Sequence, residues 1–272
     1  MRFLYFIRRY LKATQLGLIS PFRIAYNNRY LLILLIKRDI ISRTSGTLLG
    51  DAWLLFQPAL QIVGFWFLLD IVLKVKFPRG VDFVDYFLVG MLPWLFIAEM
   101  LSRSLGILTE FSSLYRRAVF PVAILPLLPL LLSTALYSVV MIVIVGLLQG
   151  VSAIPAAMII IPVVALWLMP ICYSLAVIGL FLKDIAQFFP FLITVTLYLT
   201  PILYMPDLMP EPMKWVLVLN PISDVMALIH AGVQDLHWTL GNLLRPILLW
   251  LLFIGPAWVL FCRSEPHVRE ML

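Results

Sequence analysis

The chain has 272 residues, of which 63% are hydrophobic and only 12% are charged, and its mean hydropathy is +1.03. A soluble domain cannot hide that much apolar surface, so the composition indicates a polytopic membrane protein without room for a sizeable soluble domain. The net charge of +6 does not predict nucleic-acid binding, because the basic residues lie beside apolar runs, as they do on a membrane face that attracts anionic lipid.

Residues 1–50 form a distinct N-terminal segment. Nine of its side chains are basic: Arg2, Arg8, Arg9, Lys12, Arg23, Arg29, Lys37, Arg38 and Arg43. Asp39 is its single acid. The apolar pieces between the charges, such as 30–36, are too short to span a bilayer and fit an amphipathic helix at the membrane interface. We therefore expect residues 1–50 to be interfacial or cytoplasmic.

Residues 51–272 are expected to form an all-α domain with six transmembrane helices. The apolar runs predict spans over 52–73, 83–101, 121–148, 154–182, 185–205 and 243–262. Each approaches or exceeds the roughly 20 residues that a crossing needs. The third and fourth are longer than necessary, which predicts that they tilt or project beyond the lipid.

The stretch 207–235, between the fifth and sixth spans, is expected to enter the membrane as re-entrant helices and return to the same side. It begins within a proline cluster: Pro201, Pro206, Pro210 and Pro212. Asn220-Pro221 divides the rest into two apolar runs that are too short to cross. Proline ends or kinks a helix, and non-helical backbone at membrane depth persists only where protein buries it or water surrounds it. A water-filled passage beside this stretch is therefore predicted.

Loop charges predict the orientation. With the N-terminus inside, fifteen of the twenty Lys and Arg residues are cytoplasmic. The remaining five are outside: Lys74, Lys76, Arg79, Lys214 and Arg245. This distribution follows the positive-inside rule, so both termini are expected in the cytoplasm.

Sequence motifs for catalysis are missing. The chain contains no GxxxxGK[ST] phosphate loop and no HExxH, CxxC or GxSxG. Its histidines, His230, His237 and His267, are not at the spacing of metal ligands. We therefore expect no catalytic residue, no metal site and no cofactor in this chain.

The loop over 109–120, TEFSSLYRRAVF, is cytoplasmic in this topology. It interleaves charged and apolar side chains, and the candidate coupling residues are Glu110, Phe111, Leu114, Tyr115, Arg116 and Arg117. A short amphipathic helix of this kind can sit in the groove of a partner protein and transmit its motion. The alternative is a solvated loop whose basic pair simply obeys the positive-inside rule.

Polar and aromatic side chains form stripes on the first and fifth spans. The candidate passage-lining residues are Trp53, Gln57, Gln61, Glu99, Thr194, Tyr198, Thr200 and Tyr204. Aromatic faces and amides could line a sugar passage, because pyranose rings stack on aromatic rings. The alternatives are polar contacts that hold helices together and, for Tyr204, an interfacial anchor. Trp66, Trp94, Trp215 and Trp238 are also expected to be interfacial anchors.

Glu99 lies within the second span, four residues before Arg103. An ionisable residue at membrane depth is a candidate functional residue. The alternative, which we favour, is that the two side chains neutralise each other along one helix.

Several segments together resemble the permease subunits of ABC transporters that export bacterial polysaccharides, and O-antigen exporters most of all. Residues 49–53 (LGDAW) with Pro58 resemble the entry to the family's first span, and 82–126 carries VGMLPW and FPVAILP. Residues 183–189 (KDIAQFF) and the TPILY and NP elements of 199–221 follow in the family's order. The sequence departs from the pattern where Lys183 replaces an arginine, where Ser112 and Ser113 replace an asparagine, and at His230.

The resemblance implies a homodimer in the bacterial inner membrane, with two separate ATPase subunits that bind ATP and magnesium. It also implies that 110–120 is the helix that docks on the ATPase and that 22–45 is an interfacial gate helix. The two runs 213–219 and 222–233 would cap the passage on the outer side. The cargo would be a lipid-linked polysaccharide.

Other functions are left open. Within the transporter class, the cargo could be capsule, teichoic acid, or a smaller lipid or drug. A more distant alternative is a membrane-embedded transferase for lipid-linked sugars. Its acids could come only from a loose cluster: Asp82, Asp85, Asp207, Asp224 and Asp235. These lie outside in the predicted topology, away from cytoplasmic nucleotide sugars.

Overall fold

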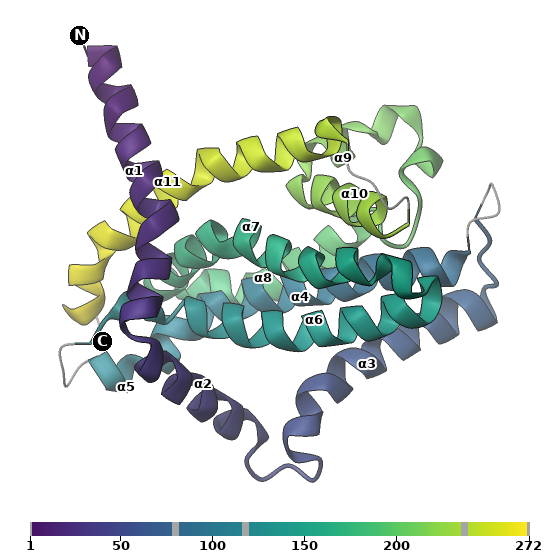
Figure 1. Cartoon of the computed structure of the whole chain (residues 1–272), viewed down its shortest axis with the longest axis horizontal. Helices are drawn as coiled ribbons and strands as arrows, with labels where there is room; N and C mark the ends of the chain where they lie inside the picture. The colour runs from purple at the N-terminus through teal and green to yellow at the C-terminus, as the bar shows by residue number, and fades with distance from the viewer. Residues whose placement is uncertain (1, 78–81, 116–119, 235–238, 271–272) are drawn as a thin grey trace.

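The computed structural model describes residues 2–77, 82–115, 120–234 and 239–270, and every regular element in these ranges is helical (Figure 1). The long elements are α1 (Arg2–Asn27), α2 (Arg29–Thr44), α3 (Trp53–Trp66), α4 (Phe83–Glu110), α6 (Leu127–Gln149), α7 (Ile154–Phe181), α8 (Lys183–Leu199), α10 (Pro221–Val233) and α11 (Leu240–Glu270). The short ones are η1 (Gly50–Ala52), the π-helical turn η2 (Phe67–Val72), α5 (Ser112–Tyr115), η4 (Val122–Ile124), η5 (Val151–Ala153), η6 (Pro206–Leu208), η7 (Glu211–Met213) and α9 (Trp215–Leu219). The predicted all-α fold class is confirmed.

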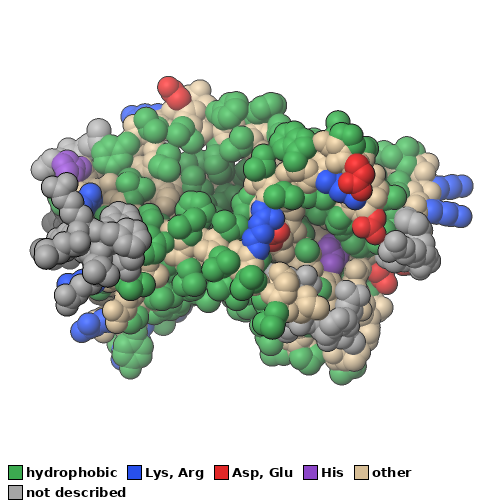
Figure 2. Space-filling model, turned by 90° about the horizontal axis from the view of Figure 1, so that it is seen from above, with side chains coloured by type: hydrophobic (Ala, Val, Ile, Leu, Met, Phe, Trp, Pro, Cys, Tyr) green, Lys and Arg blue, Asp and Glu red, His purple; other side chains and the backbone are tan. Residues whose placement is uncertain are grey.

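Five segments of the described residues are long and apolar enough to cross a membrane, or six if one bent pair of helices counts as a span. The five are Gly50–Val72, Phe83–Leu114, Val122–Gln149, Val151–Phe181 and Leu243–Val268. They correspond to the predicted first four spans and the last one, and the polytopic architecture is confirmed. Hydrophobic side chains accordingly cover most of the face that carries α11 (Figure 2).

Two predicted boundaries were wrong. The second span continues as helix to Glu110, nine residues beyond its predicted end. The fifth ends at Leu199 instead of 205, which leaves α8 with 17 residues. At 1.5 Å per residue α8 is about 25 Å long, the lower limit for a crossing.

The bent pair is the stretch predicted to be re-entrant. Glu211–Leu219 and Pro221–Val233 meet at 92°, and we call α9 and α10 the hairpin. Asn220 fixes the bend, because its Oδ1 accepts a hydrogen bond from the Ile222 backbone N–H at 3.1 Å and caps α10. Its Nδ2 donates to the Thr200 hydroxyl at 2.8 Å, just after the end of α8. The hairpin is therefore anchored to the point where α8 stops.

Figure 1 shows that α4, α6 and α7 run side by side. One end of this bundle carries α5, the C-terminal part of α11 and the crossing α1, and we call it the α5 end. The opposite end carries the hairpin. The two predicted functional regions, the coupling loop and the re-entrant stretch, thus lie at opposite ends of the molecule.

The core is built around α4, which packs on α3, α6, α7, α8 and α10. Its side chains from Val89 to Ile97 are buried on every side of the helix, as expected for a helix that is apolar all round. In contrast, α3 buries only Ile62 among its side chains. The first span therefore stands at the edge of the molecule, with most of its surface uncovered by this chain.

The N-terminal segment consists of two helices that break at Asn28, and α1 is fixed to α11. A Cβ atom added at Gly17 would lie 2.7 Å from the Ile254 carbonyl oxygen, and one at Gly255 would lie 2.8 Å from the Thr14 hydroxyl. Such close approach is possible only because both positions are glycine. In Figure 1, α1 runs across the α5 end rather than along the bundle.

Prolines within the long helices free backbone carbonyls, and aromatic side chains of other helices bond to them. Pro170 has no N–H for the Leu166 carbonyl one turn earlier, and the Trp250 indole of α11 donates to that oxygen at 2.9 Å. In α11, Pro256 frees the Leu252 carbonyl, to which the Tyr10 hydroxyl donates at 2.7 Å. These contacts satisfy polar groups that lipid cannot, which is why the helices tolerate proline.

Replacing Trp250 by phenylalanine should lower the free energy of unfolding by about 1 kcal/mol, because the Leu166 carbonyl loses its interhelical donor. In a Pro170→Ala background the same replacement should cost much less, since residue 170 then supplies an N–H to that carbonyl. The measurement is a double-mutant cycle on thermal unfolding midpoints in detergent. Equal losses in both backgrounds would show that the indole contributes only by packing.

Candidate functional site

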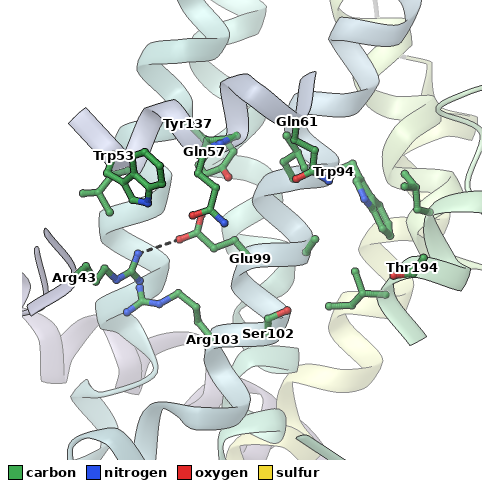
Figure 3. A pocket seen from close by; sticks show the side chains of 16 residues that line it. Arg43, Trp53, Gln57, Gln61, Trp94, Glu99, Ser102, Arg103, Tyr137 and Thr194 are labelled. Atoms are coloured by element: carbon green, nitrogen blue, oxygen red, sulfur yellow. Dashed lines mark hydrogen bonds and ion pairs between the residues drawn. The ribbon is translucent and has the colours of Figure 1, made fainter. Parts of the chain in front are cut away.

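One cavity of about 630 Å³ gathers most of the predicted passage residues. It lies between α2, α3, α4, α6 and α8, and is lined by Arg43, Trp53, Leu54, Gln57, Pro58, Gln61, Trp94, Leu95, Ala98, Glu99, Ser102, Arg103, Tyr137, Ile193, Thr194 and Leu197 (Figure 3). Five of the eight candidates are among them: Trp53, Gln57, Gln61, Glu99 and Thr194. We refer to it below as the cavity.

The cavity wall on α3 follows from helical spacing. Trp53, Gln57 and Gln61 recur every four residues, so they lie on one face of the helix. Both amides lie on this side of a helix whose remaining surface is apolar and exposed. A single apolar helix thus presents its one polar stripe to the cavity.

The facing wall on α4 shows an aromatic residue that the sequence analysis misassigned. Trp94 was expected to be an interfacial anchor, but it lies mid-helix, is only 2% exposed and lines the cavity. Glu99, Ser102 and Arg103 follow it toward the α5 end (Figure 3). The cavity therefore combines two indoles, two amides, hydroxyls and charged groups.

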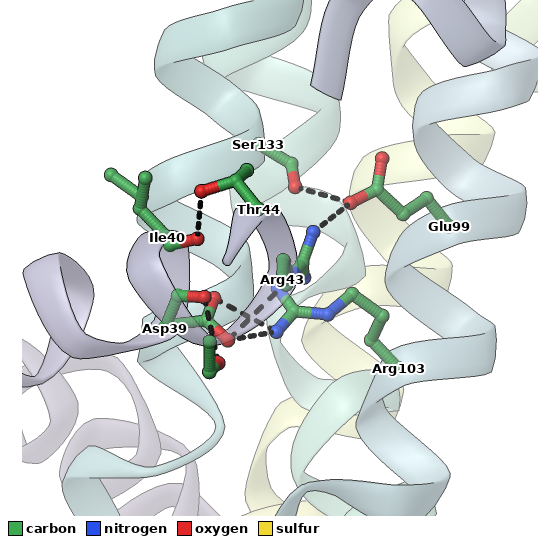
Figure 4. Close-up of polar contacts among 8 residues, drawn as sticks. Asp39, Ile40, Arg43, Thr44, Glu99, Arg103 and Ser133 are labelled. Atoms are coloured by element: carbon green, nitrogen blue, oxygen red, sulfur yellow. Dashed lines mark hydrogen bonds and ion pairs between the residues drawn. The ribbon is translucent and has the colours of Figure 1, made fainter. Parts of the chain in front are cut away.

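Four charged side chains join α2 to α4 at the α5 end of the cavity, and we call Asp39, Arg43, Glu99 and Arg103 the ion cluster (Figure 4). The Nη2 group of Arg103 donates to both carboxylate oxygens of Asp39 at 2.9 Å. Arg43 lies 3.5 Å from Asp39 through Nε and 3.4 Å from Glu99 through Nη1. The Ser133 hydroxyl of α6 also donates to Glu99 at 2.9 Å.

This arrangement corrects the expectation that Glu99 and Arg103 neutralise each other along α4. Each side chain has its ion-pair partner on α2, which approaches this part of α4 closely enough to insert Asp39 and Arg43. An ion pair between residues four apart on one helix does form in α2, between Asp39 and Arg43. For Glu99, tertiary contact overrode local spacing.

Burial controls the electrostatics of the ion cluster. Asp39 is 1% exposed, and its burial raises the pKa of the carboxyl group, while the positive charge of Arg43 opposes that rise. Two acids and two bases balance to zero net charge. Even so, the Arg43 Nη2 and Arg103 Nη1 groups are buried without a hydrogen-bond partner among the described residues. A buried N–H group without a partner costs free energy, so the ion cluster is held together at some expense in stability.

Three predicted passage residues lie away from the cavity. Tyr198 is 59% exposed on another face of α8, because it is one residue past Leu197 and points in a different direction. Thr200 is fully buried and its hydroxyl is used at the bend, where it donates to Thr196 and accepts from Asn220. Tyr204 is half-buried beside Tyr86, whose hydroxyl donates to the Pro201 carbonyl at 3.1 Å. Thr200 and Tyr204 lie beyond the end of α8 at Leu199, so helical spacing does not place them on the face of α8 that lines the cavity.

Among the described residues of the predicted coupling loop, Thr109 and Glu110 end α4, and Ser112–Tyr115 form the four-residue helix α5. Glu110 is exposed at the end of α4, whereas Phe111 is 3% exposed beneath the Arg38 guanidinium, whose carbon is 5.6 Å from the ring centre. Leu114 packs against the core, and Tyr115 ends α5. Arg116 and Arg117 lie outside the described residues. Phe111 thus connects this loop to α2.

Four residues that the structure brings to this region were not predicted as site residues: Asp39, Arg43, Trp94 and Arg103. The available signal was that Asp39 is the lone acid among nine basic residues. In the described ranges, no three His, Cys, Asp or Glu side chains gather as metal ligands would. The cavity is lined by rings, amides and hydroxyls together with the charged groups of the ion cluster.

Comparison with known proteins gives one consistent result. The family described as "ABC-2 type transporter" matches residues 30–232. Two proteins of Klebsiella pneumoniae, both named O-antigen export system permease protein RfbA, are 25% identical over 217 residues and 24% identical over 213 residues. Each alignment covers 75% of this chain and 81% of the relative. A Myxococcus xanthus protein of the same name is 26% identical over 209 residues, which cover 74% of this chain and 79% of the relative.

Proposed function

Since the chain belongs to the ABC-2 type transporter family, we propose that it is the membrane subunit of an ATP-driven exporter that moves a lipid-linked, O-antigen-like polysaccharide out of the cytoplasm. The chain is a multi-pass membrane permease. We further propose that its cargo is a polysaccharide, that it lies in the inner membrane and that both termini are cytoplasmic. The names of its relatives support this choice of cargo over capsule, teichoic acid or a smaller lipid.

The observation that carries the proposal is the chemistry of the cavity. The Trp53 indole is 40% exposed at a space that Trp94 also lines and that holds Gln57 and Gln61. Indole faces stack on the C–H faces of pyranose rings, and amides exchange hydrogen bonds with sugar hydroxyls. A polymer can slide along such a surface because each contact is weak and is replaced by a similar one as the next sugar arrives.

A homodimer explains the surfaces beside the cavity. Large apolar side chains of α3 and α8 remain exposed on either side of it, among them Leu60, Val63, Phe188 and Phe191. Two copies related by a two-fold axis would cover such surfaces with each other and close the two cavities into one passage. The hairpin would cap this passage at the outer end.

Energy would come from two ATPase subunits docked at the α5 end. Glu110 is exposed there, and Phe111 contacts Arg38 of α2. Arg38 lies about one helical turn before Ser42 and Arg43 in the same helix. A displacement of the loop by the ATPase would therefore reach α2 and, through it, the ion cluster at the mouth of the cavity. In this proposal, the contact between Phe111 and Arg38 shifts α2 and the ion cluster between two positions when the ATPase moves the loop.

The function is tested with the chain and its ATPase reconstituted in liposomes. Lipid-linked polysaccharide is expected to stimulate ATP hydrolysis, and the isolated chain is expected to hydrolyse none. Stimulation by a small lipid but not by polymer would contradict the proposed cargo. Modification of a lipid-linked sugar by the isolated chain, without the ATPase, would favour a transferase instead.

The coupling loop is tested by reversing its basic pair. Arg116→Glu with Arg117→Glu should reduce polymer-stimulated ATP hydrolysis to the rate of the unstimulated complex, because the positive charge facing the ATPase is lost. Lys76→Glu, a charge reversal between η2 and α4, is the control and should leave stimulation unchanged. If complex formation and stimulation both survive the double reversal, the loop does not couple the subunits.

A further inference from the structure

The charges that reach the cavity are balanced. Arg43, Glu99 and Arg103 all line it, and their side chains remain 23%, 27% and 14% exposed. Asp39 lies just behind them, so the local charge sums to zero. A passage for a polyanion would present excess positive charge, because an unbalanced buried charge attracts its opposite strongly. This end of the cavity has no such excess.

The same side chains offer both donors and an acceptor to one ligand. Arg43 and Arg103 are donors whose partly exposed side chains line the cavity, and the Glu99 carboxylate is an acceptor held in place by Ser133. A sugar hydroxyl can accept from a guanidinium while it donates to a carboxylate. A phosphate or ligand carboxylate can only accept, and it would lie against the negative charge of Glu99.

The indole rings of Trp53 and Trp94 also affect which ligand the cavity binds. Trp53 lies beside Arg43 (Figure 3). Trp94 lies on the opposite side of the cavity from Arg43, near Gln61. A pyranose that stacks its C–H face on an indole would direct its hydroxyl edge toward the charged end of the cavity. Stacking is strongest for rings that carry no charge that must be desolvated.

From these features we infer that the ion cluster and the two indoles form a subsite for an uncharged, hydroxyl-rich sugar, and that this subsite discriminates against anionic polymers. The inference rests on the proposed function and sharpens it, because it specifies that the polysaccharide segment in the cavity is neutral. Glu99 sets the discrimination by repelling anions, whereas Arg43 and Arg103 supply hydrogen bonds.

The test measures binding of two end-labelled hexasaccharides, neutral galactohexaose and anionic hexagalacturonate, by fluorescence anisotropy. The full chain is held in nanodiscs of uncharged phosphatidylcholine, so that lipid charge does not repel the anion. The wild-type chain should bind galactohexaose about tenfold more tightly, the ratio that one unfavourable charge contact of about 1.4 kcal/mol produces. Equal binding, or tighter binding of hexagalacturonate, would overturn the inference.

Glu99→Gln is the decisive variant, since it keeps the shape of the side chain and an acceptor for Ser133 but leaves the ion cluster with a net charge of +1. It should reverse the preference, so that hexagalacturonate binds at least as tightly as galactohexaose. Glu211→Gln removes one negative charge from an exposed residue at the hairpin end and should keep the wild-type preference. If Glu99→Gln and Glu211→Gln behave alike, the ion cluster does not select the cargo.

Failure of this inference can be told apart from failure of the proposed function. A chain that prefers hexagalacturonate, but whose complex still hydrolyses ATP in response to lipid-linked polymer, is an exporter of a charged polysaccharide. A chain that binds neither hexasaccharide lacks the subsite, and the ATP-hydrolysis experiment then decides the function independently.

Discussion

Replacing Asp39 by alanine should lower the free energy of unfolding by about 3–5 kcal/mol, the usual cost of leaving a buried charge without its partner. Asp39 is 1% exposed and holds Arg103 through both carboxylate oxygens at 2.9 Å, with Arg43 at 3.5 Å. Its loss leaves two guanidinium groups facing each other in a partly buried site. The measurement is the midpoint of thermal unfolding, followed by size-exclusion chromatography in detergent.

A second change should recover part of this loss. In the Asp39→Ala chain, Arg103→Met removes one of the unpaired charges and fills the space with an apolar side chain of similar length, so the midpoint should rise again. Glu211→Ala is the matched control, because Glu211 pairs with Lys214 while 83% exposed. Exposed pairs contribute at most about 1 kcal/mol. Equal losses from Asp39→Ala and Glu211→Ala would mean that the ion cluster does not fasten α2 to α4.

Replacing Gly179 by alanine is expected to separate the two central helices. A Cβ atom at this position of α7 would lie 2.1 Å from the Leu105 carbonyl oxygen of α4, far inside contact distance. That oxygen belongs to the backbone and cannot rotate away, so one helix must move. Overpacking of a core typically costs about 1–3 kcal/mol, and a backbone clash should be at the upper end or beyond it.

Gly106→Ala provides the control on the neighbouring residue of α4. A Cβ atom there meets nothing within 4 Å, so alanine should be neutral or slightly stabilising through its higher helix propensity. The yield of monodisperse protein and its thermal midpoint should fall for Gly179→Ala alone. If both variants behave like the wild type, α4 and α7 are not in close contact at this point.

The transport consequences follow from the same geometry. The ion cluster, the indoles and the amides belong to three different helices, α2, α3 and α4. The packing of α4 on α3, α6 and α7, together with the ion pairs between α2 and α4, brings them to one cavity. Disrupting the close α4–α7 contact should therefore also impair cargo-stimulated ATP hydrolysis, although Gly179 lies outside the cavity lining. Stability and activity are linked here through helix position rather than through direct contact with cargo.

The sequence by itself determined the class of protein, the position of most spans and the hairpin. These features are local: a run of apolar residues makes a lipid-stable helix, and the closely spaced prolines Pro201, Pro206, Pro210, Pro212 and Pro221 interrupt the helix in that stretch. The stripe of Trp53, Gln57 and Gln61 was also readable, because it is a polar pattern on an otherwise apolar helix. In such a helix, polarity is the only feature that distinguishes one face from another.

Only the tertiary structure decided which residues meet. Glu99 pairs with Arg43, 56 residues away, instead of with Arg103, and Trp94 is buried at the cavity rather than at the lipid surface. Thr200 is used to hold the hairpin, although its spacing suggested a lining residue. The physical reason is that lipid and protein interior are equally apolar, so hydrophobicity does not indicate which face of a span is inside. The rotation of each helix is set instead by close glycine contacts and by polar groups that must find partners on other helices.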